Sequence, residues 1–101
     1  MKKLTVFACL AALAAGAKTI QMPPTCTTPD GMCVDAAGNL YVADMRGDAL
    51  QRILPDGKVE FLRKGGFVRP SEPCVWNGAV YVANYGGTTL EVIPLCGACC
   101  K

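Results

Sequence analysis

Short apolar runs alternate with clusters of turn-forming residues along most of the chain. The runs are rich in Val, Tyr, Leu and Ile, and the clusters combine Gly, Asn, Asp and Pro, a pattern typical of strands joined by tight turns. No segment beyond the N-terminal region has the period of an amphipathic helix. The pattern therefore predicts an all-β chain with strands near residues 32–35, 39–43, 49–54, 58–62, 73–76, 79–83 and 88–93.

Two of the turn clusters predict hairpins. They are Pro-Asp-Gly at residues 55–57 and Asn-Gly at residues 77–78. In both, glycine can adopt the positive φ that tight hairpin turns require. We therefore expect each cluster to join two antiparallel strands, which places Asp56 in a turn.

The chain contains an internal repeat. Three segments return: PDGMCV at 29–34 as PSEPCV at 70–75, NLYVAD at 39–44 as GAVYVAN at 78–84, and LQRI at 50–53 as LEVI at 90–93. The offset is 41 residues before the turn at 78 and 40 after it. A period of about 40 residues with strand-type content is typical of β-propeller blades.

The repeat predicts the organisation of the chain. We expect Val34 and Val75 to be equivalent and buried, and likewise Val42 and Val82. Asp44 and Asn84 follow equivalent strands, and we expect them to cap the strand ends. The predicted segments are a signal peptide at 1–17, an N-terminal segment at 18–28, blade 1 at 29–62, a linker at 63–69, an incomplete blade 2 at 70–95 and a Cys-rich tail at 96–101.

Two blades do not close a propeller. Propellers close with about four to eight blades, because each blade buries its faces against its neighbours. Three explanations stay open: the chain is a fragment of a longer propeller, which we favour; it associates with copies of itself through the open blade faces; or the folded monomer is only marginally stable.

The first 17 residues have the features of an export signal. Lys2 and Lys3 precede an apolar run from Leu4 to Ala15, and the small residues at 15–17 form a cleavage site before Lys18. A membrane anchor is the alternative, but a helix of this run spans only ~18 Å of a ~30 Å hydrocarbon core. We therefore predict a secreted or periplasmic protein with no membrane partner after cleavage.

Charge and composition exclude several classes of function. The chain has 10 Lys and Arg, 8 Asp and Glu, and no His. Without Lys2 and Lys3 the charges balance, so binding of nucleic acid through its phosphates is not expected. The absence of His excludes Ser-His and Cys-His nucleophile pairs and His-ligated zinc.

The repeated segments resemble a known family. The sequence PDGMCVDAAGNLYVA at 29–43 resembles PDGMCIDAEGxLWVA of the gluconolactonase, regucalcin and senescence-marker-protein family of six-bladed propellers. RILPDGK at 52–58 resembles that family's RLDPxxGK, and SEPCVW at 71–76 is similar to its GE(S/G)PVW. Cys74 stands where the family usually has Pro.

The resemblance implies a metal-dependent lactonase. In that family a divalent cation, Ca²⁺ or Zn²⁺, is held by oxygen ligands in the central channel, next to an Asp that acts as general base. Carried over, Asp30 would be the base and a metal ligand, and Glu72 a second ligand. The family's Asn ligands lie in other blades, and Asn77 and Asn84 do not match them. A sugar lactone is the implied substrate.

Plainer interpretations stay open for the same residues. Asp30 can be the Asp of a Pro-Asp-Gly turn, and Glu72 a solvated loop carboxylate. The whole chain can be a non-catalytic repeat module for binding, because binding-type propellers also show DxxGNLYVAD. Asp30 together with Glu72 discriminates between the two functions, since a binding blade has no need of carboxylates converging on the axis. We expect Trp76, Tyr41 and Tyr81 to pack in the core between the blades and at its rim.

The chain has 7 cysteines, of which Cys9 lies in the predicted signal peptide. The other six, Cys26, Cys33, Cys74, Cys96, Cys99 and Cys100, permit several disulfide connectivities in an exported protein. Cys33 and Cys74 occupy equivalent strand positions and can instead serve as small buried apolar residues. The tail cysteines can also contribute to a zinc site or a redox pair, although neither a second pair nor a following helix supports this.

Overall fold

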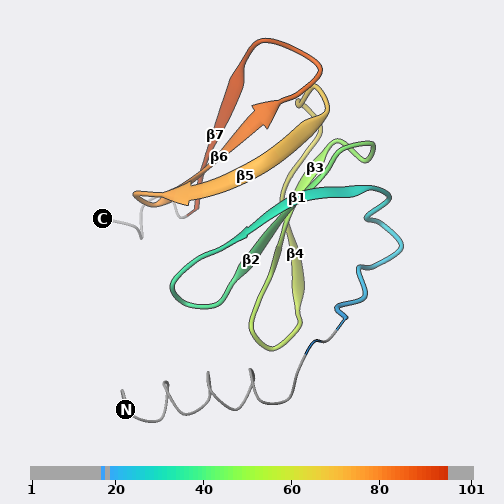
Figure 1. The fold of residues 1–101 in the computed structure, drawn as a ribbon, viewed down its shortest axis with the longest axis vertical. Coiled ribbons are helices and arrows are strands. Elements are labelled where there is room, and N and C mark those ends of the chain that lie inside the picture. The colour runs from blue at the N-terminus through green and yellow to red at the C-terminus, as the bar shows by residue number, and fades with distance from the viewer. Residues whose placement is uncertain (1–16, 18, 96–101) are drawn as a thin grey trace.

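A computed structural model describes residues 17 and 19–95, which form two antiparallel β-sheets (Figure 1). The first sheet, blade 1, has the order β1-β2-β3-β4, and the second, blade 2, has the order β5-β6-β7. The strands are β1 (Pro29–Val34), β2 (Leu40–Asp44), β3 (Ala49–Ile53), β4 (Val59–Lys64), β5 (Pro70–Trp76), β6 (Ala79–Asn84) and β7 (Leu90–Pro94).

All pairings within the two sheets are antiparallel, and the described residues contain no helix. The prediction of an all-β chain built from propeller blades is therefore confirmed. No helix in this part of the chain is long and apolar enough to cross a membrane. The predicted signal peptide at 1–17 and the Cys-rich tail at 96–101 lie largely or wholly outside the described residues.

The predicted hairpin turns follow from their glycines. Asn77 and Gly78 have φ values of 50° and 79° and connect Trp76 directly to its partner Ala79, as an Asn-Gly hairpin turn requires. In the Pro-Asp-Gly turn Gly57 has a φ of 95°, and its amide donates to the Leu54 carbonyl at 2.8 Å. Local turn chemistry thus sets the register of both hairpins.

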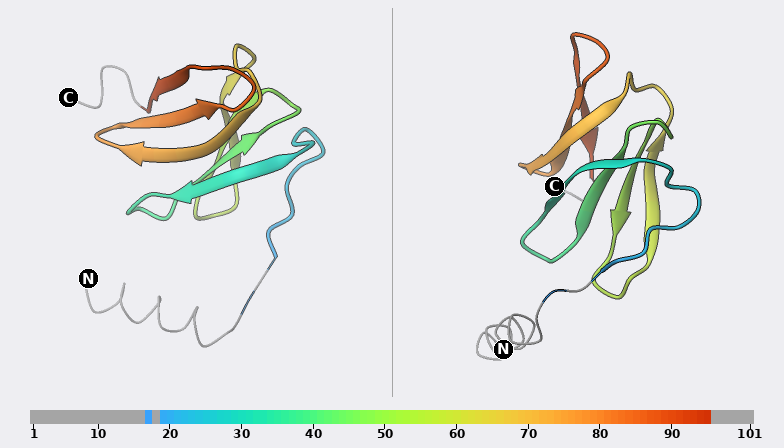
Figure 2. Two further views of the ribbon diagram at one scale, coloured as in Figure 1. Left: turned by 45° about the horizontal axis from the view of Figure 1, so that its top comes forward. Right: turned by 45° about the vertical axis from the view of Figure 1, so that its right-hand side comes forward.

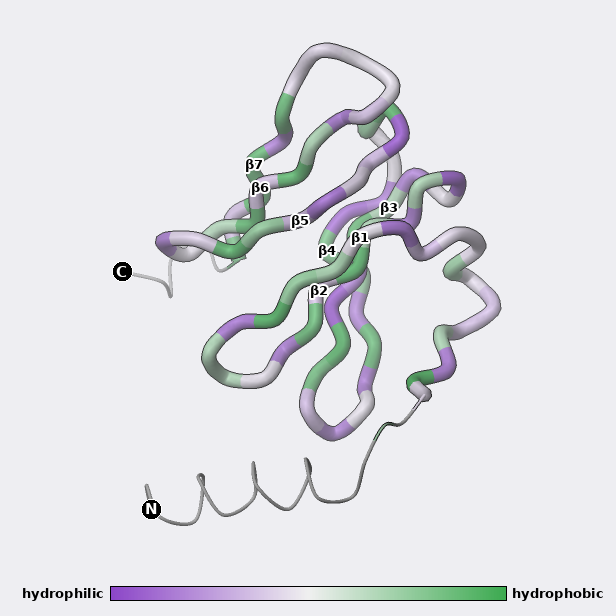
Figure 3. Tube along the Cα trace, in the orientation of Figure 1, coloured by the Kyte–Doolittle hydropathy of each residue, from purple (hydrophilic) through white to green (hydrophobic). Residues whose placement is uncertain are grey.

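The blades pack against each other through one face of each sheet (Figure 2). Tyr41 and Leu50 of blade 1 form a buried cluster with Val80, Val82 and Ile93 of blade 2. Hydrophobic residues concentrate in the strands, whereas the connecting turns are more hydrophilic (Figure 3). The core of the described residues is therefore this interface between the blades.

The predicted burial of the equivalent valines is correct for one pair and wrong in part for the other. Val42 and Val82 are buried, at 5% and 0% exposure. Val75 is partly buried against the core cluster, but Val34 is 58% exposed. Both Val34 and Val42 project from the face of blade 1 that is turned away from blade 2, and there the N-terminal residues Ile20 and Met22 lie beside Val42 but not beside Val34.

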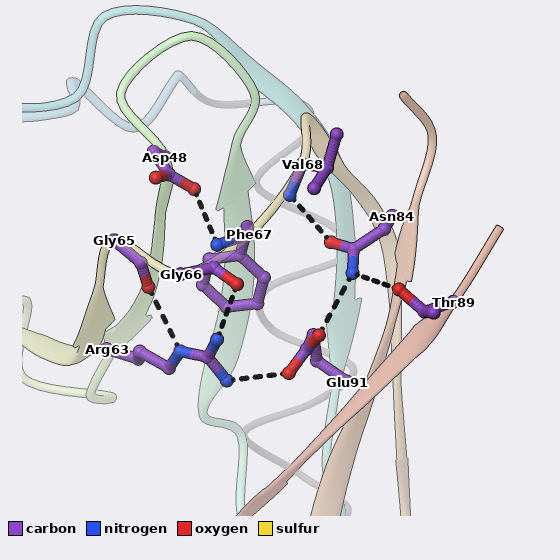
Figure 4. Close-up of polar contacts among 9 residues, drawn as sticks. All are labelled: Asp48, Arg63, Gly65, Gly66, Phe67, Val68, Asn84, Thr89 and Glu91. Atoms are coloured by element: carbon purple, nitrogen blue, oxygen red, sulfur yellow. Dashed lines mark hydrogen bonds and ion pairs between the residues drawn. The ribbon is translucent and has the colours of Figure 1, made fainter. Parts of the chain in front are cut away.

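A polar network that the sequence did not suggest also joins the blades (Figure 4). Arg63 at the end of β4 forms an ion pair of 2.9 Å with Glu91 of β7. The same guanidinium donates to the carbonyls of Gly65 and Gly66 and lies 4.4 Å from the centre of the Phe67 ring. Arg63 thus holds blade 1, the connecting loop and blade 2 together.

Candidate metal and catalytic site between the inner strands

Strands β1 and β5 are the inner strands of the two blades, and each contains a β-bulge near its start. The bulge in β1 falls between Pro29 and Met32, and the one in β5 between Ser71 and Cys74. Asp30 and Glu72, expected just ahead of the strands, therefore lie inside them. A bulge re-aims side chains away from regular alternation and is frequent next to functional sites.

Asp30 is exposed and bonded to the neighbouring blade. Its Oδ2 accepts a short hydrogen bond from the hydroxyl of Ser71, a largely buried residue of β5. Ser71 lies 41 residues after Asp30, at the equivalent position of the repeat, because Pro29 pairs with Asp44 and Pro70 pairs with Asn84. Ser71 was not a predicted site residue; its place as the polar residue at the repeat position of Asp30 is the signal that could have indicated it.

The backbone of Glu72 lies against Gly31, the residue that follows Asp30. A Cβ atom on Gly31 would lie 2.5 Å from the Glu72 amide nitrogen and 2.8 Å from its Cα, so only glycine permits this approach of the two strands. Glu72 itself has a φ of 46°. A non-glycine residue with a left-handed φ lowers the stability of the fold by about 1–2 kcal/mol, and such residues are concentrated at functional sites.

The exposed carboxylates of Asp30 and Glu72 are donors suited to a hard cation. Ca²⁺ and similar ions prefer carboxylate and other oxygen ligands, so the donor chemistry of Asp30 and Glu72 fits part of such a site. Within residues 17 and 19–95 the structure shows no cluster of three or more His, Cys, Asp or Glu side chains. The pair could therefore hold a cation only together with water or other donors.

A partly open cavity of about 430 Å³ lies beside Asp30. Apolar side chains line most of it, with Ile20 and Met22 of the N-terminal segment on one side and Val42 and Ile53 of blade 1 on the other. The cavity exists because the N-terminal segment covers the outer face of blade 1 only in part.

Other candidate residues have structural roles. The Asp56 carboxylate accepts the Lys58 amide at 2.9 Å inside its hairpin turn. Tyr41 lies in the core as expected, whereas Trp76 is 64% exposed and contacts Tyr81 at 6.2 Å between ring centres. Trp76 is therefore not part of the core between the blades, because no sheet among the described residues covers its face of blade 2.

Asp44 caps the end of β2 as predicted. Its carboxylate is buried and accepts the amides of Thr27, Thr28 and Gly47 at 2.8–3.0 Å. Burial alone would raise the pKa of Asp44, but these hydrogen bonds outweigh it and hold the pKa below its usual value. Asn84 is likewise buried and caps β6 by accepting the Val68 amide at 2.9 Å.

Three cysteines belong to the described residues, and Cys26, Cys33 and Cys74 are all free thiols there. Cys33 is partly buried against the core cluster, and burial raises the pKa of its thiol. Cys74 is exposed, so the alternative of a small buried apolar residue does not hold for it. The two residues differ because blade 2 covers the face of blade 1 that carries Cys33, whereas the described residues leave the equivalent face of blade 2 uncovered.

Comparison with known proteins agrees with this architecture. The model of a family described as SMP-30/Gluconolactonase/LRE-like region matches residues 2–85. The chain belongs to this family. Its fold is a β-propeller, and the two sheets of the chain are two of the family's blades. No curated protein matches the sequence.

Proposed function

We propose that the chain carries part of the metal-dependent lactone hydrolase centre of the SMP-30/gluconolactonase family. One observation supports the proposal most strongly: Asp30 and Glu72, the carboxylates that the family resemblance selects, lie at the bulges of β1 and β5, where the backbones of Gly31 and Glu72 make close contact. Asp30 and Glu72 thus come from different blades but lie on two strands in close contact, which a shared site requires.

In this proposal Asp30 and Glu72 hold the divalent cation, Ca²⁺ or Zn²⁺, and Asp30 also acts as general base. The bound cation would supply Lewis acidity toward the carbonyl of a sugar lactone. Asp30 would take a proton from the attacking water, with its carboxylate oriented by the hydroxyl of Ser71. The attack of water opens the lactone ring and leaves a hydroxy acid.

We expect cation binding to be weak and turnover to be low or absent. A calcium site takes about six to eight oxygen ligands, and two carboxylates supply only a part of them. We therefore expect a dissociation constant of about 10⁻³ M or weaker, the range of the weakest extracellular calcium modules. The alternative function is that of a non-catalytic propeller module for binding.

Calorimetric titration with Ca²⁺ and with Zn²⁺ tests the proposal. Asp30→Asn should reduce the binding heat, because it removes a ligand charge while keeping the shape of the side chain. Asp56→Asn is the matched control, since Asp56 belongs to the same Pro-Asp-Gly tripeptide in a distant hairpin turn. The structure places Asp30 in β1 and not in a Pro-Asp-Gly turn, so identical isotherms for the wild type and Asp30→Asn would leave it as a structural residue of the bulge and favour the binding module.

We also propose that the protein is exported, which rests on residues 1–17 alone. N-terminal sequencing of protein recovered outside the cytoplasm should begin at Lys18. Recovery of external protein that begins at Met1 would contradict cleavage at this site.

A further inference from the structure

Each blade has an apolar face that the described chain does not cover fully. On blade 2 this free face carries Trp76, Leu90 and Val92, which are 64%, 68% and 52% exposed. On blade 1 it carries Met32 and Val34, which are 62% and 58% exposed. Exposed apolar groups of this size are typical of surfaces that bind another protein.

The two free faces repeat the two sides of the interface that the molecule already buries. Leu90 of the free face of blade 2 corresponds to Leu50, which is fully buried between the blades. Val34 of the free face of blade 1 corresponds to Val75, which packs against the same core. The further pairs are Cys74 with Cys33, Tyr81 with Tyr41, Leu40 with Val80, Val42 with Val82 and Ile53 with Ile93.

We infer that the free face of blade 2 binds the free face of blade 1 of a second copy of this chain. The contact would repeat the packing between blade 1 and blade 2, since both partners carry nearly the same residues in the same register. This is a head-to-tail contact, and such contacts form a ring when the rotation closes. Propellers have about four to eight blades, so the ring would contain about two to four copies.

Polar groups at the inner strands agree with this contact. Within one chain Ser71 of blade 2 donates a hydrogen bond to Asp30 of blade 1. Ser71 is the repeat equivalent of Asp30. In the new interface Ser71 of one copy would therefore occupy the position that Asp30 has within a chain, and Asp30 of the other copy the position of Ser71, so the two residues would again lie beside each other. The free faces therefore match in their polar rim as well as in their apolar centre.

The N-terminal segment occupies part of the proposed interface. Ile20 and Met22 lie over Val42 and Ile53, but they leave the cavity of about 430 Å³. A docked blade would displace this segment, and its side chains would fill the cavity that the N-terminal segment leaves open. This is favourable because protein interiors are close-packed and keep few voids.

The test measures the mass of the full chain in solution by native mass spectrometry and light scattering. We expect a discrete oligomer of two, three or four chains. Val34→Glu and Leu90→Glu each place a charge in one free face, and each should give monomers. Val68→Glu is the matched control, because Val68 is 48% exposed in the loop between the blades, and it should leave the oligomer intact.

Mixing the two variants tests the head-to-tail geometry. The Val34→Glu variant keeps an intact free face on blade 2, and the Leu90→Glu variant keeps an intact free face on blade 1. These two faces can bind each other, so an equimolar mixture should form heterodimers that contain one chain of each variant. Both substitutions change exposed side chains, and circular dichroism of each monomer verifies that it remains folded. A monomeric wild type, or a mixture that stays monomeric, would overturn the inference.

A second measurement follows the thiol of Cys74, which is exposed in the single chain. The rate of alkylation at Cys74, measured by peptide mass spectrometry, should be lower in the assembled wild type than in the monomeric Leu90→Glu variant. Equal alkylation rates in the wild type and in Leu90→Glu would contradict the proposed contact. The inference does not depend on cation binding, so its failure would leave the proposed function untouched.

Discussion

Leu50 and Leu90 occupy the same position in the two blades, yet their environments are opposite. Leu50 is fully buried, whereas Leu90 is 68% exposed. Tyr41 and Tyr81 differ in the same direction, since Tyr41 is fully buried and Tyr81 only partly. The difference teaches that burial in a propeller blade is decided by the neighbouring blade and not by the residue or its strand.

The caps at the ends of β2 and β6 show the same principle for polar groups. Asp44 only accepts hydrogen bonds, which it receives from the segment before β1 and from the following turn. Asn84 accepts one from Val68 and also donates to Thr89 and Glu91, at 2.8 and 3.0 Å (Figure 4). An amide is needed in blade 2 because the neighbouring groups there include acceptors.

The largest expected contrast is between Leu50→Ala and Leu90→Ala. Leu50→Ala leaves a cavity in the core between the blades and should lower the free energy of unfolding by about 2–5 kcal/mol. Leu90→Ala removes an exposed side chain and should change it by about 0.5 kcal/mol or less at concentrations where the chain is monomeric. Urea denaturation of both variants measures the contrast, and equal effects would refute the burial difference.

The next contrast is between the caps. Asp44→Ala removes a buried charged acceptor from several amides and should cost about 3 kcal/mol, whereas Asn84→Ala should cost about 1–2 kcal/mol. Because folding lowers the pKa of Asp44, its stabilising contribution is present above the usual carboxyl pKa and is lost as the pH falls below it.

Asp44→Asn separates the charge of this cap from its shape. The variant should weaken the dependence of stability on pH below the usual carboxyl pKa, and Asn84→Asp is the reciprocal change in blade 2. Unfolding curves recorded at neutral pH and at pH values near and below 4 compare the variants with the wild type. An unchanged acid dependence in Asp44→Asn would contradict the assigned role of the carboxylate.

A smaller contrast is expected for the two tyrosine hydroxyls. The Tyr41 hydroxyl donates to Asp35 at 2.7 Å, and Asp35 also accepts from Asn39. Burial alone would raise the pKa of Asp35, but these bonds lower it to about 2. Tyr41→Phe should therefore destabilise the fold by about 1–2 kcal/mol and raise that pKa, which NMR titration of the Asp35 carboxyl can follow. Tyr81→Phe is the control and should have little effect on either quantity.

The smallest expected effect lies at the candidate site. Glu72→Gly relieves the positive φ of Glu72 and should stabilise the fold by about 0.5–1 kcal/mol, after allowing for the greater freedom of glycine when unfolded. The same variant removes a carboxylate and should weaken cation binding in the calorimetric titration. A loss of stability would show that the Glu72 side chain supports the fold and does not merely occupy a strained position.

Local features of the fold could be predicted from the sequence. The strands, the Asn-Gly and Pro-Asp-Gly hairpins and the repeat all depend on interactions between residues close in the chain, and the family follows from the repeated motifs. The strand-end role of Asp44 and Asn84 could be predicted for the same reason. Asp30 and Glu72 were selected by resemblance, and their roles stay predictions.

Contacts between segments far apart in the chain were decided only by the tertiary structure. The approach of Gly31 to Glu72, the hydrogen bond from Ser71 to Asp30 and the ion pair between Arg63 and Glu91 join residues 28 to 41 positions apart. The exposure of Val34 and Cys74 likewise depends on which face of each blade has a neighbour. A repeat makes the blades alike in sequence, but burial depends on what covers each face: the other blade buries Leu50, and the N-terminal segment lies over Val42 and Ile53 of the free face of blade 1.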